Sequence, residues 1–388
     1  MTRPLSPTTL GVRAGIDTDP SHGAVVPPIY LSTNFNFDGL GGKRAYDYSR
    51  SGNPTRDQLG NALAALEGGA GGVITATGMS AITLVLHALL SPGQRLVVPH
   101  DCYGGSWRLF NALADKGAFE LDTCDLTDPA AVAAALAKKP TLVWLETPSN
   151  PLLRITDVAA VTAAAHAVGA LVAVDNTFLS PALQRPIELG ADIVIHSTTK
   201  YINGHSDIVG GAAIARDAAL HQKLAWWANA LGITGSPFDS YLTLRGLRTL
   251  GARMRVHQEN TAAIVDLLSN HAAVTQVYYP GLPHHSGHAI AKAQQHGFGA
   301  MVSFEVAHGQ DGVAALVDGI ECFTLAESLG GVESLIAHPA TMTHAAMTNA
   351  ARATAGISPA LVRLSVGIED SEDLLTDLRT ALDRVLAL

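Results

Sequence analysis

The chain has 388 residues, of which 47% are hydrophobic and 15% are charged, and these values exclude a disordered chain. Its length suggests two domains with a shared core. The net charge of −9, without a long basic run, argues against nucleic acid as a partner, and no apolar run reaches the roughly 18 to 20 residues of a membrane span. Three scattered cysteines, Cys102, Cys124 and Cys322, form no CxxC pair and indicate a reducing compartment, so we expect a cytoplasmic protein.

The predicted elements divide the chain into three parts. Residues 1–60 are rich in Gly, Pro and Asn and show little periodicity, so they predict an extended arm that must pack on something. From 61 to 255, apolar strands at 96–99, 142–145, 171–174 and 193–195 alternate with helices such as 129–137 and 158–168. This alternation is typical of a mainly parallel sheet with helices on both faces. A long helix around 253–268 then leads into a smaller α+β region, with a strand at 301–306 and a final helix near 372–386.

Lys200 comes shortly after the β-branched apolar run at 193–195 and lies among hydroxyl-bearing residues and glycines. A free lysine has a pKa of about 10.4, so it becomes a nucleophile near neutral pH only where burial or positive charge disfavours the ammonium. The end of a strand can supply that burial. Ser197 and Thr199 would bring two hydroxyls to a phosphate such as that of pyridoxal phosphate (PLP). The pattern indicates a Schiff-base lysine, although a solvated lysine in a turn would have the same sequence signature.

Asp175 ends another apolar strand, the one that precedes the strand before Lys200. Ligands of open α/β sheets bind beyond the carboxyl ends of the strands, so Asp175 and Lys200 are expected to face one pocket. A carboxylate in that place can pair with the protonated ring nitrogen of PLP. The alternative is an aspartate that only caps the next turn.

Two further strand ends carry candidate residues. A short strand near 73 leads through Gly78 and Met79 into a predicted helix, and the N–H groups of such a turn can bind phosphate. The segment is neither GxGxxG nor a P-loop, so nucleotide binding is not indicated. Tyr103 follows another strand end and could stack on a planar cofactor, unless it is an ordinary core or rim tyrosine.

These segments and others along the chain resemble the Cys/Met-metabolism PLP enzymes, a family of synthases, lyases and sulfhydrylases. The resemblance implies fold type I, an α/β fold with a mainly parallel sheet of the seven-stranded type flanked by helices. It further implies a PLP-binding domain at 61–255, a smaller α+β C-terminal domain at 256–388 and an N-terminal arm at 1–60. The matching motifs are Val26-Pro-Pro-Ile, Tyr48-Ser-Arg50-Ser-Gly-Asn-Pro-Thr-Arg56, Leu66-Glu-Gly-Gly, Gly78-Met79, Tyr103-Gly-Gly, Glu146-Thr-Pro-Ser-Asn-Pro151, Val174-Asp-Asn-Thr-Phe178, Ser197-Thr-Thr-Lys-Tyr201, Gly204-His-Ser-Asp207 and Arg363-Leu-Ser-Val-Gly-Ile-Glu369.

The resemblance also implies a homotetramer built as two dimers, with each active site shared across a dimer interface. Tyr48 and Arg50 would then bind the phosphate of the neighbouring subunit's PLP, whereas the alternative for Arg50 is a surface salt bridge. The other implied PLP-binding residues are Gly78, Met79, Tyr103, Asp175, Ser197, Thr199 and Lys200, with Lys200 and Tyr103 as the catalytic residues. The implied substrate-binding residues are Arg363 for the α-carboxylate, and Ser328, Asn150, Glu327 and Asp47.

Four segments, 101–103, 225–229, 234–241 and 323–334, look most like the bacterial cystathionine γ-synthase branch of the family. This branch implies γ-replacement of O-succinyl-L-homoserine, or O-acetyl-L-homoserine, by L-cysteine to give L-cystathionine, a step of transsulfuration in methionine biosynthesis. A cystathionine γ-lyase or an O-acylhomoserine sulfhydrylase is the alternative, while Gly105 disfavours the methionine γ-lyases, which have a cysteine near this tyrosine. A non-catalytic binding protein is a remote alternative because the catalytic residues are present.

The acyl donor and a metal site are the last open questions. A succinyl group ends in a carboxylate, and Arg108, about five residues into the helix expected after Tyr103, could bind it, unless Arg108 is only an exposed helix residue. The choice of donor stays open because succinyl-using relatives have a second arginine where this chain has Ser51. No metal is predicted, since the densest histidine cluster, His284, His285 and His288, has no carboxylate at ligand spacing.

Overall fold

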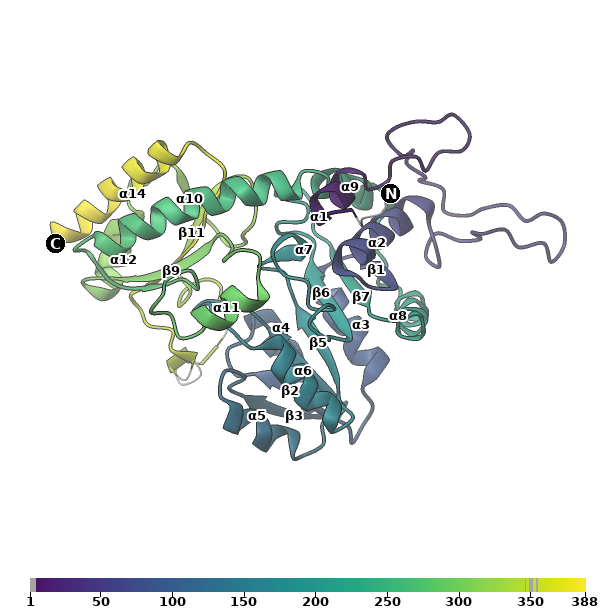
Figure 1. Cartoon of the computed structure of the whole chain (residues 1–388), viewed down its shortest axis with the longest axis horizontal. Helices are drawn as coiled ribbons and strands as arrows, with labels where there is room; N and C mark the ends of the chain where they lie inside the picture. Colours follow the sequence, from purple (N-terminus) through teal and green to yellow (C-terminus); the bar gives the residue numbers. More distant parts are fainter. Residues whose placement is uncertain (1–4, 346, 349–351, 354) are drawn as a thin grey trace.

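The structure is a computed structural model that describes residues 5–345, 347–348, 352–353 and 355–388. It contains a larger sheet with its helices, a smaller sheet toward the C-terminus, and an N-terminal arm (Figure 1). The long helix α10 (Leu250–Asn270) runs along both sheet regions, and the arm projects from the side of the molecule opposite the C-terminus.

The larger sheet has seven strands, of which β7 alone runs against the others. Strands β5 and β6 are direct parallel neighbours, with Asp175 opposite Ile195, so the predicted adjacency of the two strands is confirmed. The prediction of a mainly parallel sheet is likewise confirmed. The spatial order is β1 (Gly71–Thr75), β7 (Gly211–Ala215), β6 (Ile193–Ser197), β5 (Leu171–Asp175), β4 (Leu142–Glu146), β2 (Arg95–Pro99) and β3 (Glu120–Cys124).

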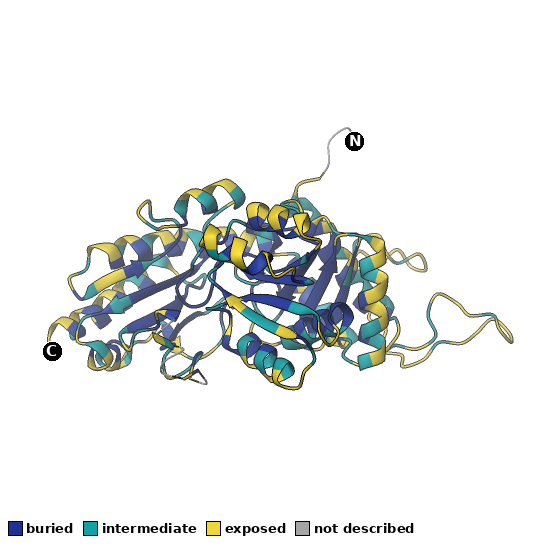
Figure 2. Ribbon diagram, turned by 90° about the horizontal axis from the view of Figure 1, so that it is seen from below, coloured by how far each residue is buried: buried dark blue, intermediate teal, exposed yellow. Residues whose placement is uncertain are grey.

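Helices cover both faces of this sheet, which is why its central strands are continuous apolar runs. Along β4, Leu142 and Trp144 pack toward one layer of helices, and Val143 and Leu145 pack toward the other. Figure 2 shows these strands buried between helices with exposed outer faces. The first layer contains α3 (Gly78–Leu89), α4 (Gly104–Asp115) and α8 (Ala218–Leu231), and the second contains α5 (Pro129–Leu136) and α6 (Val158–Ala167).

The helices begin where the sequence supplies capping residues. The side chain of Thr77 accepts a hydrogen bond from the Ser80 N–H and starts α3 directly after β1. Asp128 and Asp157 cap α5 and α6 in the same way, and both helices end within one residue of their predicted limits. Caps of this kind place the first turn of α3 at the carboxyl edge of the sheet.

The smaller domain has a five-stranded sheet that packs against α10 and the C-terminal helix α14 (Ser371–Leu386). The predicted strand at 301–306 and the predicted final helix are confirmed. The strand order is β10 (Phe323–Leu325), β11 (Ser334–Ala337), β12 (Leu361–Ser365), β9 (Met301–Val306) and β8 (Val274–Tyr278), and the shorter helices are α11 (His288–Gln294) and α12 (Gly309–Val317).

Residues 13–53 form the projecting arm, which contains no helix and only an isolated bridge between Asn34 and Tyr48. A short helix, α1 (Pro7–Val12), precedes it and was not predicted; Ser6 caps it and Pro7 fits its first turn. Helix α2 (Pro54–Glu67) follows the arm and leads into β1, while α7 (Ser180–Leu183) and α9 (Pro237–Leu247) complete the larger domain. The predicted boundary at 255 falls inside α10, which belongs to both halves, so the division into domains stays a prediction.

Candidate active site

A cavity of about 630 Å³ opens at the carboxyl ends of β4, β5 and β6, between the two sheet regions. Parallel strands bring the polar residues that follow them to this one edge. Twelve of the fifteen residues predicted for the site line the cavity: Gly78, Met79, Tyr103, Arg108, Asn150, Asp175, Ser197, Thr199, Lys200, Glu327, Ser328 and Arg363. The other three, Asp47, Tyr48 and Arg50, do not.

Lys200 lies in the turn after β6 and is partly buried in the cavity. Its Nζ donates a hydrogen bond to Ser328 Oγ at 2.7 Å. Burial lowers the pKa of Lys200 to about 8, with a further contribution from the Arg363 guanidinium, while Glu327 acts in the opposite direction. Because a neutral amine is both a nucleophile and a base, the site makes Lys200 far more reactive near neutral pH than a solvated lysine.

The first turn of α3 and the end of β6 form a narrow cradle. The N–H groups of Gly78 and Met79 have no acceptor within the helix, so they are available to an anion. A Cβ atom on Gly78 would come within 2.8 Å of the Ser197 Cβ, so only glycine can lie this close to Ser197. Thr199 lines the same region, but its hydroxyl also bonds to the backbone of Gly210. The cradle supplies hydrogen-bond donors suited to a phosphate group.

Asp175 ends β5 at the floor of the cavity. One of its oxygens, Oδ1, accepts a hydrogen bond from the Thr177 N–H at 3.0 Å, so it caps the following turn as well as lining the cavity. Burial raises the pKa of Asp175, although hydrogen bonds from Thr177 and the charge of His196 counter part of the rise. A cationic N–H group from a ligand would therefore be favoured beside it.

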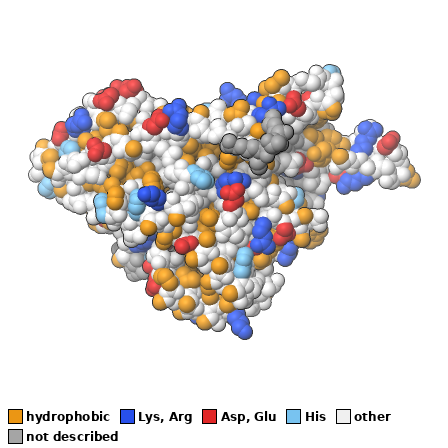
Figure 3. All heavy atoms as spheres, in the orientation of Figure 1, with side chains coloured by type: hydrophobic (Ala, Val, Ile, Leu, Met, Phe, Trp, Pro, Cys, Tyr) orange, Lys and Arg blue, Asp and Glu red, His pale blue; other side chains and the backbone are white. Residues whose placement is uncertain are grey.

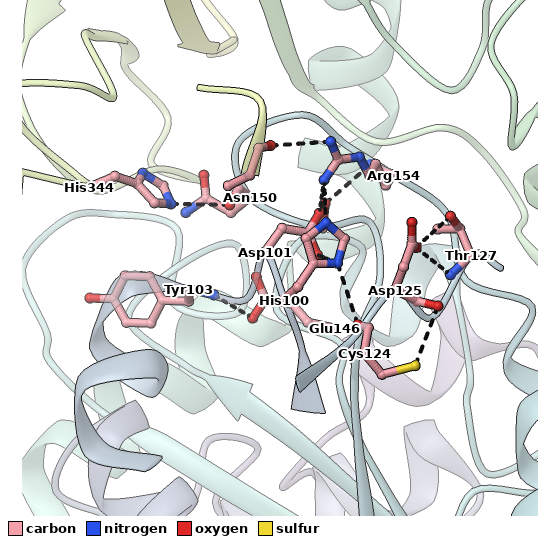
Figure 4. A network of polar contacts seen from close by, with 12 residues as sticks. His100, Asp101, Tyr103, Cys124, Asp125, Thr127, Glu146, Asn150, Arg154 and His344 are labelled. Atoms are coloured by element: carbon pink, nitrogen blue, oxygen red, sulfur yellow. Dashed lines mark hydrogen bonds and ion pairs between the residues drawn. The ribbon is translucent and has the colours of Figure 1, made fainter. Parts of the chain in front are cut away.

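Glu146 is a second carboxylate of the cavity and was not predicted to be a site residue. It ends β4 directly opposite Asp175 in the strand register. Burial and the neighbouring Asp175 carboxylate raise the pKa of Glu146 well above its usual value. The Glu146 side chain accepts a hydrogen bond from the Tyr103 N–H at 2.9 Å, as Figure 4 shows, and so fixes the turn that carries the tyrosine ring.

Arg363 reaches the cavity from β12 of the smaller sheet and is only 3% exposed. Its Nη1 donates to Asn150 Oδ1 and its Nη2 donates to the Ser328 carbonyl, both at 2.9 Å. Among the described residues its Nε has no hydrogen-bond partner. Burial lowers the pKa of Arg363 to about 10. A buried guanidinium held by neutral acceptors is suited to binding a carboxylate from a ligand.

Ser328 brings the two sheet regions together at this point. It receives the Lys200 Nζ on its hydroxyl and the Arg363 guanidinium on its carbonyl. Its φ of 89° lies in the left-handed region that favours glycine, and such backbone strain is concentrated at functional sites. Glu327, the preceding residue, is exposed at the cavity wall.

Tyr103 and Arg108 lie on the α4 side of the cavity. Tyr103 is 41% exposed, so its side chain is available to a planar ligand. Burial of its hydroxyl raises the pKa of Tyr103, and Arg108 partly offsets this effect. Arg108 is exposed and lies about one turn further along the helix, in the cavity lining. It carries a positive charge to the mouth of the cavity.

A polar network behind Tyr103 and Asn150 holds the loops that carry them (Figure 4). Asp101, which is buried, pairs with Arg154 at 2.9 Å and accepts a hydrogen bond from Ser149 at 2.7 Å. Arg154 also donates to the Ala355 carbonyl and thus joins the larger domain to the segment after β11. The network keeps the strand-end loops of β2 and β4 in a fixed relation.

His344 is another cavity residue that the sequence did not predict. Its Nε2 donates to the Asn150 carbonyl at 3.1 Å, and the ring is 1% exposed. Burial, reinforced by the Arg363 charge, lowers the pKa of His344 to about 4, so the ring is neutral at physiological pH. The Thr343 and Met342 side chains line the cavity beside it.

The arm carries Asp47, Tyr48 and Arg50 away from this chain's own cavity. The Arg50 Nε donates to Asn229 Oδ1 at 3.0 Å, and its guanidinium lies 5.5 Å from the centre of the Tyr48 ring. Asp47 pairs with Lys43 and accepts a hydrogen bond from Ser51. The structure therefore separates these residues from the other twelve within one chain.

The histidine cluster near 284–288 is engaged in local bonds. His288 Nδ1 contacts the Pro280 carbonyl at 2.8 Å, and His285 Nδ1 accepts from the Gly287 N–H. Within the part of the chain that the structure describes, no group of three or more His, Cys, Asp or Glu side chains is placed to hold a metal ion. Nor do the described residues include a helix of the length and hydrophobicity needed to cross a membrane.

Comparison with known proteins identifies the family. Residues 8–383 match the family described as Cys/Met metabolism PLP-dependent enzyme. The chain is 58% identical to the cystathionine gamma-synthase of Escherichia coli (strain K12), over 95% of this chain and 96% of the relative. It is also similar to the crystal structure of cystathionine gamma synthase from Xanthomonas oryzae pv. oryzae in complex with cystathionine, with 70% identity and a TM-score of 0.98 over 99% of this chain and 100% of the other.

A more distant solved structure shares the fold as well. The cystathionine gamma-lyase from Lactobacillus plantarum, complexed with L-serine, is 42% identical, with a TM-score of 0.95 over 98% of this chain and 100% of the other. The predicted fold type I is thereby confirmed. The chain belongs to the Cys/Met-metabolism PLP-dependent enzymes, and its cofactor is PLP.

Proposed function

We propose that the chain is a cystathionine γ-synthase, a PLP-dependent transferase that replaces the γ-acyloxy group of an O-acyl-L-homoserine with the sulfur of L-cysteine. Its likeness to proteins of that name over nearly the whole chain supports the proposal. The structural observation that carries it is a lysine with a lowered pKa facing a buried arginine that lacks a carboxylate partner among the described residues. Together they suit an amino-acid substrate that must be held and deprotonated.

Three independent observations support the binding of PLP in this cavity. The glycine-only cradle between Gly78 and Ser197 suits the phosphate, with Met79 and Thr199 beside it. Asp175, with its raised pKa, suits the ring nitrogen, and the exposed face of Tyr103 suits the ring. When bound, PLP supplies an electron sink that stabilises negative charge on the carbon atoms of the amino acid.

Lys200 is the residue we propose for proton transfer. Near pH 8, about half of the protein molecules carry Lys200 as a neutral amine. The neutral amine can take a proton from the substrate and return it to another carbon. Ser328 holds Nζ at 2.7 Å and so orients the amine toward the cavity. The raised pKa of Tyr103 keeps its hydroxyl protonated, so it can donate a hydrogen bond during these transfers.

The α-carboxylate of the substrate would bind Arg363, with Asn150 and Ser328 fixing the guanidinium from behind. Arg108 would bind the terminal carboxylate of a succinyl donor at the cavity mouth. Glu327, on the same wall, would face the amino group of an amino-acid substrate. Ser51 lies on the arm and offers no positive charge, so Arg108 is the cation on which the choice between succinyl and acetyl donors would depend.

The arm supports a shared active site. Tyr48 and Arg50 are exposed and lie outside their own chain's cavity, as expected of residues that complete a neighbour's phosphate site, and Asp47 would accompany them. The arm also exposes large apolar side chains, and Figure 3 shows it protruding with hydrophobic and basic groups at its surface. These side chains are Val25, Val26, Ile29, Tyr30, Leu31, Phe37 and Leu40. We infer a homotetramer built as two dimers.

We also propose the division into an arm at 1–60, a PLP-binding domain at 61–255 and a C-terminal domain at 256–388. The separate sheets of the two larger parts support it. The free thiols of Cys102, Cys124 and Cys322 support a reducing compartment, and we propose the cytoplasm.

Product analysis tests the proposed reaction. The holoenzyme is incubated with O-succinyl- or O-acetylhomoserine, with and without cysteine, and the products are measured by mass spectrometry. We expect cystathionine and one equivalent of the free acid when cysteine is present. Formation of 2-oxobutanoate at the same rate with and without cysteine would indicate a lyase. In a further incubation that contains both sulfide and cysteine, homocysteine formed in preference to cystathionine would indicate a sulfhydrylase.

A further inference from the structure

Glu67, the last residue of α2, lies behind the cavity and is completely buried. A single oxygen of its carboxylate, Oε1, accepts hydrogen bonds from His196 Nε2 at 2.6 Å and from Asn176 Nδ2 at 3.0 Å. Both partners are also fully buried. One carboxylate oxygen thus joins residues of two different strand ends.

The two residues that Glu67 joins are each adjacent to a residue of the proposed cofactor site. Asn176 directly follows Asp175 at the end of β5, and His196 directly precedes Ser197 in β6. The backbone ties the same two points together, because the Asn176 N–H donates to the Ile195 carbonyl at 3.0 Å. Movement of Glu67 would therefore change the spacing between Asp175 and Ser197.

Asn176 has no freedom to turn away from Glu67. Its Nδ2 also donates to the Gln184 carbonyl at 2.7 Å, and its Oδ1 accepts from Gln184 Nε2 at 3.1 Å. Thr177, the next residue, accepts a hydrogen bond from the Ser197 N–H at 2.9 Å. The turn after β5 is thus fixed on the side facing β6 and on the side facing α7.

The opposite ends of the same two strands provide a natural comparison. Asp192 precedes β6 and is also completely buried; its Oδ2 accepts from the Val172 N–H at 2.7 Å and from His166 Nε2 at 2.8 Å. Four residues of strand, roughly 13 Å, separate this carboxylate from the cavity end. Both carboxylates connect β5 with β6 and face a histidine, but only Glu67 lies next to the cavity.

Burial makes the two hydrogen bonds of Glu67 important. A carboxylate without solvent contact is costly unless donors face it, and His196 Nε2 and Asn176 Nδ2 are the donors here. Loss of this acceptor would therefore free both strand ends from their shared partner.

We propose that Glu67 is a positioning residue for PLP: through His196 and Asn176 it fixes Ser197, at the phosphate end of the cofactor site, relative to Asp175, at the ring-nitrogen end. The inference rests on the proposed cofactor site. An ordinary buried polar residue would behave differently from Glu67. Its loss would lower the stability of the fold without a specific loss of PLP affinity.

The test uses three variants of the full chain. Glu67→Gln keeps the shape and weakens both hydrogen bonds, whereas Glu67→Met removes the acceptor altogether. Asp192→Asn is the matched control, because it neutralises the buried carboxylate at the far end of the same strands. For each protein, PLP is removed, the dissociation constant is measured by titrating PLP back, and the unfolding temperature is recorded with and without PLP.

We expect Glu67→Gln to raise the PLP dissociation constant about tenfold and Glu67→Met to raise it further, because a neutral acceptor holds its donors less tightly than a carboxylate. In Asp192→Asn the PLP dissociation constant should stay within about twofold of the wild-type value, because distant sites act independently. The unfolding temperature of this variant should nevertheless fall. The rise in unfolding temperature on adding PLP should shrink in the Glu67 variants alone, since this rise depends on the PLP concentration relative to the dissociation constant.

Two results would overturn the inference. One is a Glu67→Gln variant that binds PLP as tightly as the wild type. This result would overturn the inference even if Glu67→Met does not fold. The other is an equal loss of affinity in Asp192→Asn, which would make Glu67 a general support of the two strands. Failure of the wild-type protein to bind PLP is a separate outcome, and it would refute the proposed cofactor site together with this inference.

Discussion

Replacing Arg363 with lysine probes the proposed substrate anchor while keeping its positive charge. In the structure the guanidinium uses Nη1 and Nη2 on Asn150 and Ser328 and keeps Nε without a partner among the described residues. A lysine has a single ammonium group and cannot reproduce this planar arrangement. The substrate carboxylate would therefore lose at least one charged hydrogen bond.

The size of the effect follows from that geometry. A hydrogen bond to a charged group contributes about 1.5 to 3 kcal/mol, which corresponds to a loss of roughly 10- to 150-fold in kcat/KM. Arg363 is 3% exposed, so water cannot replace the lost bond easily. The matched control is Arg216→Lys: Arg216 pairs with Asp192 at the far end of the sheet and its side chain is 42% exposed, so we expect no more than about a twofold change.

The assay compares two substrates. Steady-state cystathionine formation is measured with O-succinylhomoserine and with an analogue that lacks the α-carboxylate. The wild type should use the analogue poorly, and Arg363→Lys should cause little further loss with it, because the interaction is already absent. Equal losses with both substrates would refute the assignment, since they would show that Arg363 acts on the fold or the cavity and not on the carboxylate.

Three further predictions concern the remaining site residues. In the apoenzyme, an amine-selective reagent should modify Lys200 with a midpoint near pH 8, measured by peptide mass mapping, because its lowered pKa leaves it neutral above that pH; a midpoint near that of solvated lysines would contradict the burial argument. Mixing Lys200→Ala with Arg50→Ala subunits should restore activity, because some shared sites then contain both groups; mixtures no more active than either parent would exclude a shared site. Arg108→Ala should raise KM for O-succinylhomoserine by about 1.5 to 3 kcal/mol in free-energy terms, much more than for the acetyl ester, and equal effects on both esters would remove Arg108 from the donor site.

The strand-end residues of the site could be predicted because their signal is local. Asp175 and Lys200 each follow a short apolar run, and the rule that parallel strands end at one edge of a sheet brings them together. Gly78 was predictable for the same reason, since a glycine between a strand and a helix marks a phosphate-binding turn. The order of strands in the sheet could not be read from these runs, because pairing between strands is set by tertiary packing.

Residues whose role depends on distant parts of the chain were missed. Glu146 ends a strand as Asp175 does, but nothing in its own segment shows that two carboxylates lie opposite each other. His344 is in the cavity only because its segment folds back onto Asn150. Arg363 and Ser328 were assigned from the family resemblance, since a single arginine in a strand of the smaller sheet has no local signal of binding.

The arm shows a further limit of sequence reasoning. Its composition predicted an extended segment, and the structure has one, but α1 was missed because a helix of six residues has too short a pattern. Tyr48 and Arg50 were expected to act on a neighbouring subunit, and their separation from their own cavity follows from the direction in which the arm leaves the body of the molecule. That direction depends on contacts such as the bond between Arg56 and the Gly235 carbonyl, which no local pattern specifies.

The most direct test of the account is to identify the residue that carries PLP. Borohydride reduction fixes PLP onto the lysine to which it is bound, and digestion followed by mass spectrometry locates the added phosphopyridoxyl mass. We predict that the mass lies on Lys200 and that Lys200→Ala acquires none and forms cystathionine several orders of magnitude more slowly than the wild type. Labelling of a different lysine, or wild-type turnover by Lys200→Ala, would contradict the assignment of this cavity as the catalytic site.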